Sequence, residues 1–274
     1  MTIDKVICTC THADLHTFAV TSTFITKFIE ANHYIVYVPE DTVEEAKTLV
    51  SGAFNILSEK DYYHILEYIK SKNNIKPERN GWYFQQFIKI SELSKGEDSS
   101  VNLIWDADTA PLRKIIFSRN SLIFYYQGKE HHQPYFELIK NILGMEKIID
   151  SSFIAQCFPA RTTWVKNLIL DVENIHKKEW YKAIIDKIDF NNSSGFSEYE
   201  TLGTYISHKY SNEISINKDW KIWSRDGSKY IGKIDDLYKV AALLSKHLDH
   251  ISFEKWQKRD KNILRRIKFK YFGR

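Results

Sequence analysis

Apolar residues follow two alternating patterns through the first half of the chain. Short runs rich in β-branched and aromatic side chains predict strands at residues 6–8, 34–38, 54–57 and 101–105. Between these runs, apolar positions recur at helical spacing and predict helices over residues 16–31, 42–50 and 62–69, with another beginning at Gly81. This alternation predicts an α/β fold in which helices flank a mostly parallel central sheet.

The second half of the chain has a less regular pattern. Strands are predicted at residues 121–126 and 152–158, and helices over residues 135–143, 163–170, 180–188, 198–208 and 237–248. No internal repeat and no linker-like segment interrupts the sequence. We therefore expect a single domain over residues 1–253, followed by a distinct tail over residues 254–274.

The composition is that of a folded protein, with 43% apolar and 27% charged residues. No run approaches the roughly 18 apolar residues of a membrane span, and the first residues lack the pattern of a signal peptide. Cys8, Cys10 and Cys157 have neither zinc-site spacing nor the number needed for a disulfide framework. We therefore expect a cytoplasmic protein with reduced thiols.

Charge is distributed unevenly along the chain. Residues 255–274 hold nine Lys and Arg against one Asp, a net charge of +8, whereas the whole chain carries +4 and the first 254 residues therefore −4. A mildly acidic body argues against nucleic acid as a partner. The tail pattern predicts a basic amphipathic helix lying on an anionic membrane surface, the alternative being a helix packed on the body. Its apolar positions are Trp256, Ile263, Leu264, Ile267 and Tyr271.

The sharpest chemical signal is Asp106-Ala107-Asp108, directly after a predicted strand. Open parallel sheets bind ligands beyond the carboxyl ends of their strands, which brings this pair together with residues 9–14 and Pro39. Two exposed carboxylates one residue apart can converge on a hard divalent cation such as Mn²⁺ or Mg²⁺. The alternative is a solvated turn without a ligand.

A second signal is Phe196-Ser197-Glu198-Tyr199-Glu200. Ser197 followed three residues later by Glu200 fits the capping box that begins a helix, in which the glutamate reaches back to the backbone. Glu198 lacks such a partner and could serve as a general base. Alternatively, it merely favours the positive end of the helix.

Two further patterns leave both a structural and a functional interpretation open. Trp82, Gln85, Gln86 and Lys89 share one helical face, so Lys89 could neutralise a phosphate or lie exposed on a surface helix. Of the histidines, His250 is the one favoured to complete a metal shell with the aspartates. The glycine-rich nucleotide-binding motifs and the nucleophile elbow are absent from the sequence.

Taken together, four stretches resemble those of bacterial GT-A-type glycosyltransferases, of the group found in capsule and lipopolysaccharide O-antigen gene clusters. The resemblance covers roughly residues 1–255, and the second and fourth stretches are more specific than the generic D-x-D. The stretches are Thr9-x-Thr11-x-x-Asp14, Gly81-Trp82-Tyr83-x-Gln85-Gln86-x-x-Lys89, Trp105-Asp106-Ala107-Asp108, and Phe196-Ser197-Glu198-Tyr199-Glu200 with Gly203.

The resemblance implies a GT-A-like fold with a nucleotide-sugar half and an acceptor half. It implies that Asp106 and Asp108 hold Mn²⁺ or Mg²⁺ against the diphosphate of a nucleotide-sugar donor, with UDP as the favoured nucleotide. Thr9, Thr11 and Asp14 would lie beside the nucleobase and ribose, and Gln85, Lys89 and Asp106 would also face the donor. Glu198, 90 residues beyond Asp108, corresponds to the base of inverting members. In a retaining enzyme it would position substrate instead.

The resemblance further implies a saccharide or lipid-linked acceptor in surface polysaccharide synthesis, with the enzyme at the inner face of the cytoplasmic membrane. Two other functions remain open. A metal-dependent sugar-phosphate nucleotidyltransferase would use the same carboxylates, but residues 9–17 lack the glycine-rich basic loop that such enzymes usually need. A non-catalytic adaptor would use the basic tail to hold the acidic body at a membrane.

Overall fold

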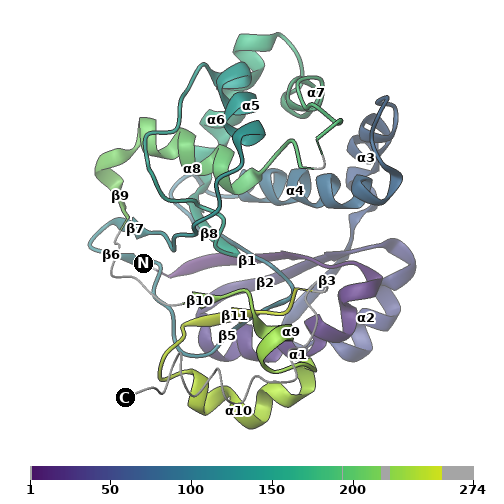
Figure 1. Cartoon of the computed structure of the whole chain (residues 1–274), viewed down its shortest axis with the longest axis vertical. Coiled ribbons are helices and arrows are strands. Elements are labelled where there is room, and N and C mark those ends of the chain that lie inside the picture. The colour runs from purple at the N-terminus through teal and green to yellow at the C-terminus, as the bar shows by residue number, and fades with distance from the viewer. Residues whose placement is uncertain (1, 193, 217–222, 255–274) are drawn as a thin grey trace.

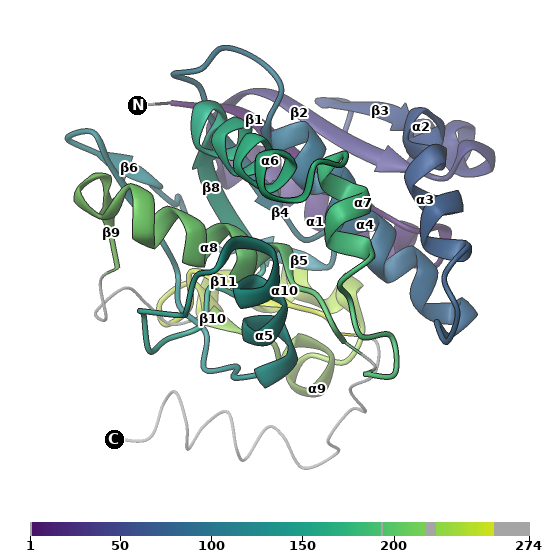
Figure 2. The same ribbon diagram turned by 90° about the horizontal axis from the view of Figure 1, so that it is seen from above.

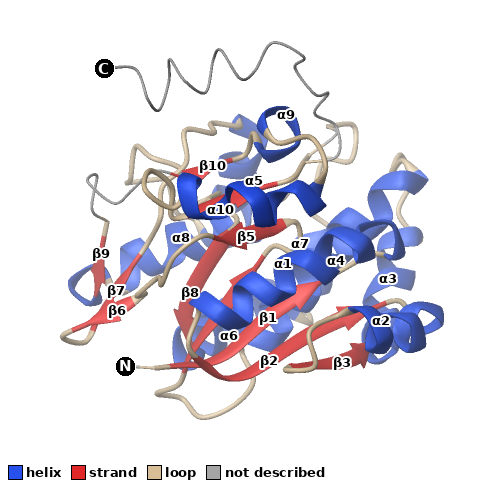
Figure 3. Ribbon diagram, turned by 90° about the horizontal axis from the view of Figure 1, so that it is seen from below, coloured by secondary structure: helices blue, strands red, loops and turns tan. Residues whose placement is uncertain are grey.

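The computed structural model describes residues 2–192, 194–216 and 223–254. At its centre is a five-stranded sheet in the order β3-β2-β1-β4-β8 (Figure 3). Its first four strands are parallel, and β8 is antiparallel to β4. The predicted α/β fold with a mostly parallel sheet is therefore confirmed. The strands are β1 (Ile3–Thr9), β2 (Ala31–Val38), β3 (Phe54–Ser58), β4 (Val101–Trp105) and β8 (Cys157–Arg161).

Helices cover both faces of this sheet (Figure 1). Helix α1 (Leu15–Phe28) lies on one face, and α4 (Asn80–Leu93), α6 (Thr162–His176) and α8 (Glu198–Lys209) lie on the other, as both Figure 1 and Figure 2 show. The remaining helices are α2 (Val43–Leu49), α3 (Tyr63–Lys70), α5 (Gln133–Leu143), α7 (Trp180–Ile185), α9 (Gly227–Tyr230) and α10 (Leu237–Leu244). In the described residues, no helix is long and apolar enough to cross a membrane.

Two smaller sheets follow the central one. In the order β10-β11-β5, the first joins β10 (Trp223–Ser224), β11 (His250–Ser252) and β5 (Thr109–Pro111). This pairing brings the end of the described chain back beside the segment that follows Asp108. The second sheet, β6-β7-β9, contains β6 (Ser118–Arg119), β7 (Leu122–Phe124) and β9 (Ile214–Ser215).

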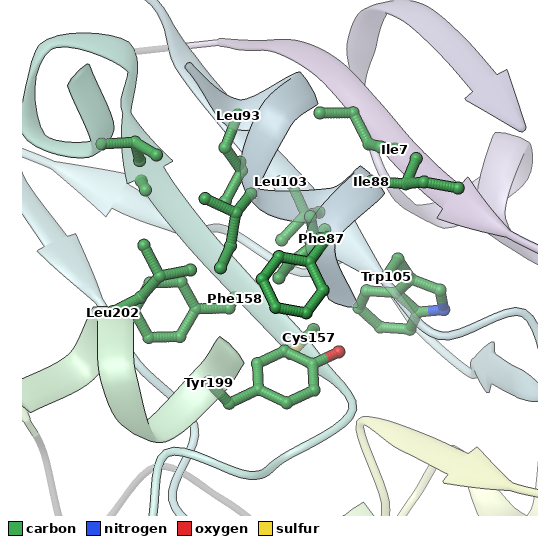
Figure 4. Close-up of a cluster of buried hydrophobic side chains, with 14 of the residues drawn as sticks. Ile7, Phe87, Ile88, Leu93, Leu103, Trp105, Cys157, Phe158, Tyr199 and Leu202 are labelled. Carbon is green, nitrogen blue, oxygen red and sulfur yellow. The ribbon is translucent and has the colours of Figure 1, made fainter. Parts of the chain in front are cut away.

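The main core lies between the central sheet and the face of α4 and α8. Phe87 and Ile88 from α4, Trp105 from β4 and Leu202 from α8 are fully buried there (Figure 4). Burying each such side chain stabilises the fold by roughly 1.5–3 kcal/mol. The same residues fix the direction of α4 and of the first turn of α8, which carry polar side chains on their other faces.

The sequence pattern located strands β1 to β4 and helices α1 to α4, but it missed the short strands β5 and β6, and two later predictions were wrong in extent. Residues 152–156 form an irregular loop, and the strand predicted over 152–158 begins only at Cys157. Gln156 has a positive φ of 64°, which an extended strand cannot contain. Likewise, Asn120 and Ser121 have positive φ in a turn, so β7 is shorter than predicted. The predicted tail helix lies outside the described residues.

The loop 152–156 is held in place from two sides. Gly203 on α8 packs so closely against the Phe153 ring that a methyl group there would overlap it, and Gly128 approaches the Ile154 carbonyl in the same way. In addition, the Glu200 carboxylate accepts hydrogen bonds from Ser152 Oγ at 2.6 Å and from the Phe153 amide at 3.2 Å. The loop therefore has a fixed path beside the strand ends.

We predict that Gly203→Ala lowers the free energy of unfolding by about 1–3 kcal/mol, because overpacking against Phe153 outweighs the helix propensity gained. Gly81→Ala is the matched control, since Gly81 also lies in a helix but has open space at its Cβ position. Urea denaturation measures both variants. Equal or higher stability of Gly203→Ala would contradict the close packing described.

Candidate active site

A cavity of about 350 Å³ lies where β1 and β4 end, as expected for a parallel sheet. Its walls come from the ends of the two strands, from one face of α4, from the first turn of α8, and from the loop 152–156. Segments near Glu130 and Arg225 complete the wall. The lining residues are Thr9, Asp14, Arg79, Trp82, Gln85, Gln86, Lys89, Asp106, Ala107, Asp108, Glu130, Tyr135, Ile154, Gln156, Ser194, Ser197, Glu198, Tyr199, Arg225 and Glu254.

Lys89 connects three walls of this cavity. Its Nζ atom lies 2.5 Å from Asp106 Oδ1 and 2.9 Å from Glu198 Oε1. Only 8% of its side chain is exposed. Burial opposes its charge, but the Asp106 and Glu198 carboxylates outweigh burial and raise the pKa of Lys89, so it stays protonated. The alternative of an exposed surface lysine is wrong, because Lys89 is buried. Its charge is already shared between two carboxylates, so it is not a free cation for a phosphate.

Glu198 is the first residue of α8 and is buried. Its backbone amide donates to Gln86 Oε1 at 3.0 Å, which ties the beginning of α8 to α4. Burial raises the pKa of Glu198, Lys89 lowers it, and Asp106 raises it again, with a net upward shift. A carboxylate of raised pKa is a better proton acceptor near neutral pH than an ordinary surface glutamate. Glu198 therefore has a side-chain partner, Lys89, that the sequence pattern did not reveal.

Asp106 is held in one orientation by two donors. Both Lys89 and the Tyr199 hydroxyl, at 2.7 Å, bind its Oδ1 atom. Among the described residues, Oδ2 has no hydrogen-bond partner and is left for a ligand. The turn that carries Asp106 is itself fixed, because Trp105 Nε1 donates to the Thr109 carbonyl and Thr21 Oγ1 donates to the Ala107 carbonyl.

Asp108 lies in an excess of negative charge. Burial, then repulsion from Asp106 and Glu254, raises its pKa to about 7. The cavity lining contains six carboxylates and three cationic side chains, and two of the cations are already paired. Arg225 contacts Glu130 at 2.7 Å and Glu254 at 3.4 Å, and Lys89 contacts Asp106 and Glu198. Both aspartates are partly buried, so the expectation of exposed carboxylates is wrong.

These residues fit a hard divalent cation. Asp106 Oδ2 and the Asp108 carboxyl supply oxygen ligands, and a cation would relieve the repulsion that keeps Asp108 partly protonated. In the part of the chain that the structure describes, no group of three or more His, Cys, Asp and Glu side chains has metal-binding geometry. A cation here would therefore complete its shell with water and ligand oxygens, as Mg²⁺ commonly does.

His250 does not join the aspartates in one ligand group, contrary to the third-ligand expectation. It is fully buried, with Nε2 3.0 Å from the Ala155 carbonyl oxygen and its ring stacked on Trp223 at a centroid distance of 5.4 Å. Burial lowers its pKa to about 4. His250 thus belongs to a buried aromatic cluster with Trp105, Tyr126 and Trp223, which lie far from it in the sequence.

Thr9, Asp14 and Gln85 line the cavity as the sequence suggested. Thr11 does not line it. Instead its hydroxyl donates to Asp14 Oδ2 at 2.5 Å, so Thr11 fixes the side chain of Asp14 at the beginning of α1. Thr9 and Asp14 therefore reach the cavity, and Thr11 contributes only by holding Asp14.

Only half of the predicted capping box forms at the beginning of α8. Ser197 Oγ accepts the Glu200 amide at 3.3 Å, but the Glu200 carboxylate turns away from the backbone of Ser197. It binds Lys147 at 2.7 Å and the loop residues Ser152 and Phe153 instead. A long-range partner of this kind leaves no periodic signal in the sequence.

Sequence reasoning also missed several cavity residues. Tyr199 directly follows Glu198 in the Phe196–Glu200 motif, so the motif itself could have indicated that Tyr199 belongs to the site. Arg79 precedes the Gly81–Lys89 motif by less than one turn. Glu130, Arg225 and Glu254 come from separate segments that reach the cavity only through the folded chain, and no sequence feature marked them.

The fold is shared with two solved glycosyltransferases. Mouse xyloside xylosyltransferase 1 superposes with a TM-score of 0.50 at 10% identity, over 93% of this chain and 98% of its own. The galactosyltransferase LgtC, solved in complex with donor and acceptor sugar analogues, gives a TM-score of 0.51 at 9% identity, over 95% of this chain and 91% of its own. The architecture is therefore GT-A-like, as predicted.

A family profile matches residues 1–215, and the chain belongs to this family of unknown function, DUF6492. No curated protein sequence matches the chain.

We predict that Asp108→Asn raises the free energy of unfolding in metal-free buffer at pH 8, by about 2 kcal/mol after allowance for solvent screening. A carboxyl with a native pKa of about 7 and an ordinary value of 3.8 costs stability progressively as the pH rises from about 4 to 7. The gain should therefore shrink toward pH 4.

Asp106→Asn is the matched comparison and should be destabilising, because it removes a partner of buried Lys89. Urea denaturation across this pH range measures both variants. A loss of stability in Asp108→Asn at pH 8 would contradict the charge excess described around Asp108.

Proposed function

We propose that the protein is a glycosyltransferase that moves a sugar from a nucleotide-diphospho-sugar, with UDP as the favoured nucleotide, to a saccharide or lipid-linked acceptor. The observation that carries the proposal is the contact of Lys89 with both Asp106 and Glu198. It brings a carboxylate suited to a metal–diphosphate and a carboxylate suited to proton removal into one cavity at the strand ends. The fold shared with two glycosyltransferases over nearly the whole chain supports the same activity.

In this proposal the donor diphosphate binds at the Asp106 end of the cavity. Asp106 and Asp108 would hold Mn²⁺ or Mg²⁺, and the bound ion would stabilise the leaving nucleotide as negative charge develops on it. An acidic cavity would otherwise repel a diphosphate. Tyr199 and Lys89 keep Asp106 oriented through Oδ1. Thr9 and Asp14, which line the cavity at and after the end of β1, would contact the nucleoside.

Glu198 is the proposed general base of an inverting transfer. The acceptor oxygen forms a bond to the anomeric carbon, the bond from that carbon to the diphosphate oxygen breaks, and the acceptor proton passes to the Glu198 carboxylate. Lys89 occupies one oxygen of Glu198, and no other side chain of the described residues hydrogen bonds to this carboxylate. In a retaining transfer, Glu198 would position substrate and no base would be needed.

We predict that Glu198→Gln lowers turnover by about 10²–10⁴-fold with donor binding retained, because the shape is kept and the base is removed. Glu44→Gln is the matched control, since Glu44 also lies in the first turn of a helix but is exposed and outside the cavity. Release of nucleoside diphosphate measures turnover, and calorimetry with UDP measures binding. Full activity of Glu198→Gln would reject the base, and full activity of Asp106→Asn with Asp108→Asn at saturating Mn²⁺ would reject the metal role.

We further propose that the tail places the enzyme at the inner face of the cytoplasmic membrane, where lipid-linked acceptors of capsule or O-antigen synthesis would be within reach. The support is the amphipathic, basic sequence pattern of residues 255–274. A variant that lacks the tail should end after Glu254, because Glu254 lines the cavity and accepts a hydrogen bond from Gln156 at 3.0 Å.

We predict that replacing Arg265, Arg266 and Lys268 with Gln weakens binding to anionic vesicles by about 10²-fold, because each basic residue near such a surface contributes about 1 kcal/mol. Hydrolysis of the nucleotide-sugar should be unchanged. Sedimentation with phosphatidylglycerol vesicles, and with neutral vesicles as the control, measures the effect. Failure of the unaltered chain to bind anionic vesicles at low salt would overturn the membrane proposal.

A further inference from the structure

Arg79 lines the same cavity at the beginning of α4. Its guanidinium group lies over the Trp82 ring, 3.8 Å from the ring centroid, and Nη2 donates to Ser194 Oγ at 3.1 Å. Stacking and hydrogen bonding hold the planar group in one orientation. A fixed guanidinium presents parallel N–H donors in the geometry that a carboxylate or a phosphate accepts.

The charge of Arg79 is not neutralised by the protein. The other two cationic side chains of the cavity, Lys89 and Arg225, each contact two carboxylates. For Arg79, no carboxylate of residues 2–192, 194–216 and 223–254 lies within ion-pair distance. Burial accordingly lowers the pKa of Arg79, with only weak compensation from its neighbours. A half-buried cation without a counter-ion, in a cavity dominated by carboxylates, is suited to a ligand that brings its own negative charge.

The position of Arg79 separates it from the Asp106 end of the cavity. Arg79 is the N-cap residue of α4, and Lys89 follows ten residues later in this helix. At the rise of an α-helix, their backbones are about 15 Å apart along the helix axis. Trp82, Gln85 and Gln86 line the cavity between them. This row of one aromatic and two amide side chains is suited to the hydroxyl-bearing faces of a saccharide.

We propose that Arg79 receives a negatively charged group, a carboxylate or a phosphate, carried by the acceptor saccharide. The inference rests on the proposed function, which assigns the Asp106 end of the cavity to the donor and leaves the Arg79 end to the acceptor. Trp82 and Ser194 are positioning residues that hold the guanidinium. A neutral sugar would leave the charge of Arg79 unpaired and bind less tightly.

The test measures sugar binding to the full chain saturated with UDP and Mg²⁺. The probes are methyl glucuronide, methyl glucoside 6-phosphate and neutral methyl glucoside, followed by saturation-transfer NMR. At least one charged probe should bind roughly tenfold more tightly than the neutral one, which corresponds to one charge-assisted hydrogen-bonded contact. A preference for the glucuronide identifies a carboxylate as the source of the charge, and a preference for the 6-phosphate identifies a phosphate.

Arg79→Gln should abolish this preference, and Arg79→Lys, which keeps the charge, should retain part of it. Arg119→Gln is the matched control, because Arg119 is exposed on β6 and does not line the cavity. UDP affinity of each variant verifies that the cavity is folded. Absence of a preference in the unaltered protein, or a preference that survives Arg79→Gln, overturns the inference. If the unaltered protein neither binds UDP nor hydrolyses a nucleotide-sugar, the proposed function is rejected instead.

Discussion

The ion pairs of Lys89 with Asp106 and Glu198 connect the parts of the molecule on which the proposed chemistry depends. Lys89 comes from α4, Asp106 from the end of β4, and Glu198 from the first turn of α8. All three groups are largely withdrawn from water, so removing Lys89 would leave two buried carboxylates without a counter-ion, at a cost of about 3–5 kcal/mol. The same contact therefore holds two helices and a strand end together and sets the charge of the cavity.

Helix α8 serves both the cavity and the scaffold around it. Glu198 faces Lys89 in the cavity, whereas Glu200, two positions later, binds the loop 152–156 from the opposite side. Gly203 completes this arrangement by admitting the Phe153 ring. The two glutamates of one motif thus have different tasks because successive residues of a helix point in different directions. One is suited to chemistry, and the other fixes the wall beside it.

Much of the fold could be predicted because its signals are local. Buried parallel strands give continuous apolar runs, and the helices between them keep helical spacing. Asp106, Asp108 and Glu198 were found because each follows a recognisable strand end or helix beginning. The loop 152–156 has the apolar composition of a strand, but Phe153 packs against Gly203 of α8 and Gln156 has a positive φ, and neither feature is visible in the sequence pattern. His250, Glu200 and Arg225 could not be placed, since their partners Ala155, Ser152 and Glu130 lie 95, 48 and 95 residues away in the sequence.

The central claim is that the cavity around Lys89 binds and activates a nucleotide-sugar. Its most direct test is to incubate the full chain with a panel of UDP-, GDP-, TDP- and CMP-sugars and to measure release of free sugar with Mn²⁺, with Mg²⁺ and with a chelator. We expect slow hydrolysis of at least one nucleotide-diphospho-sugar that requires the metal and stops on chelation. Absence of both binding and hydrolysis across the whole panel would contradict the claim.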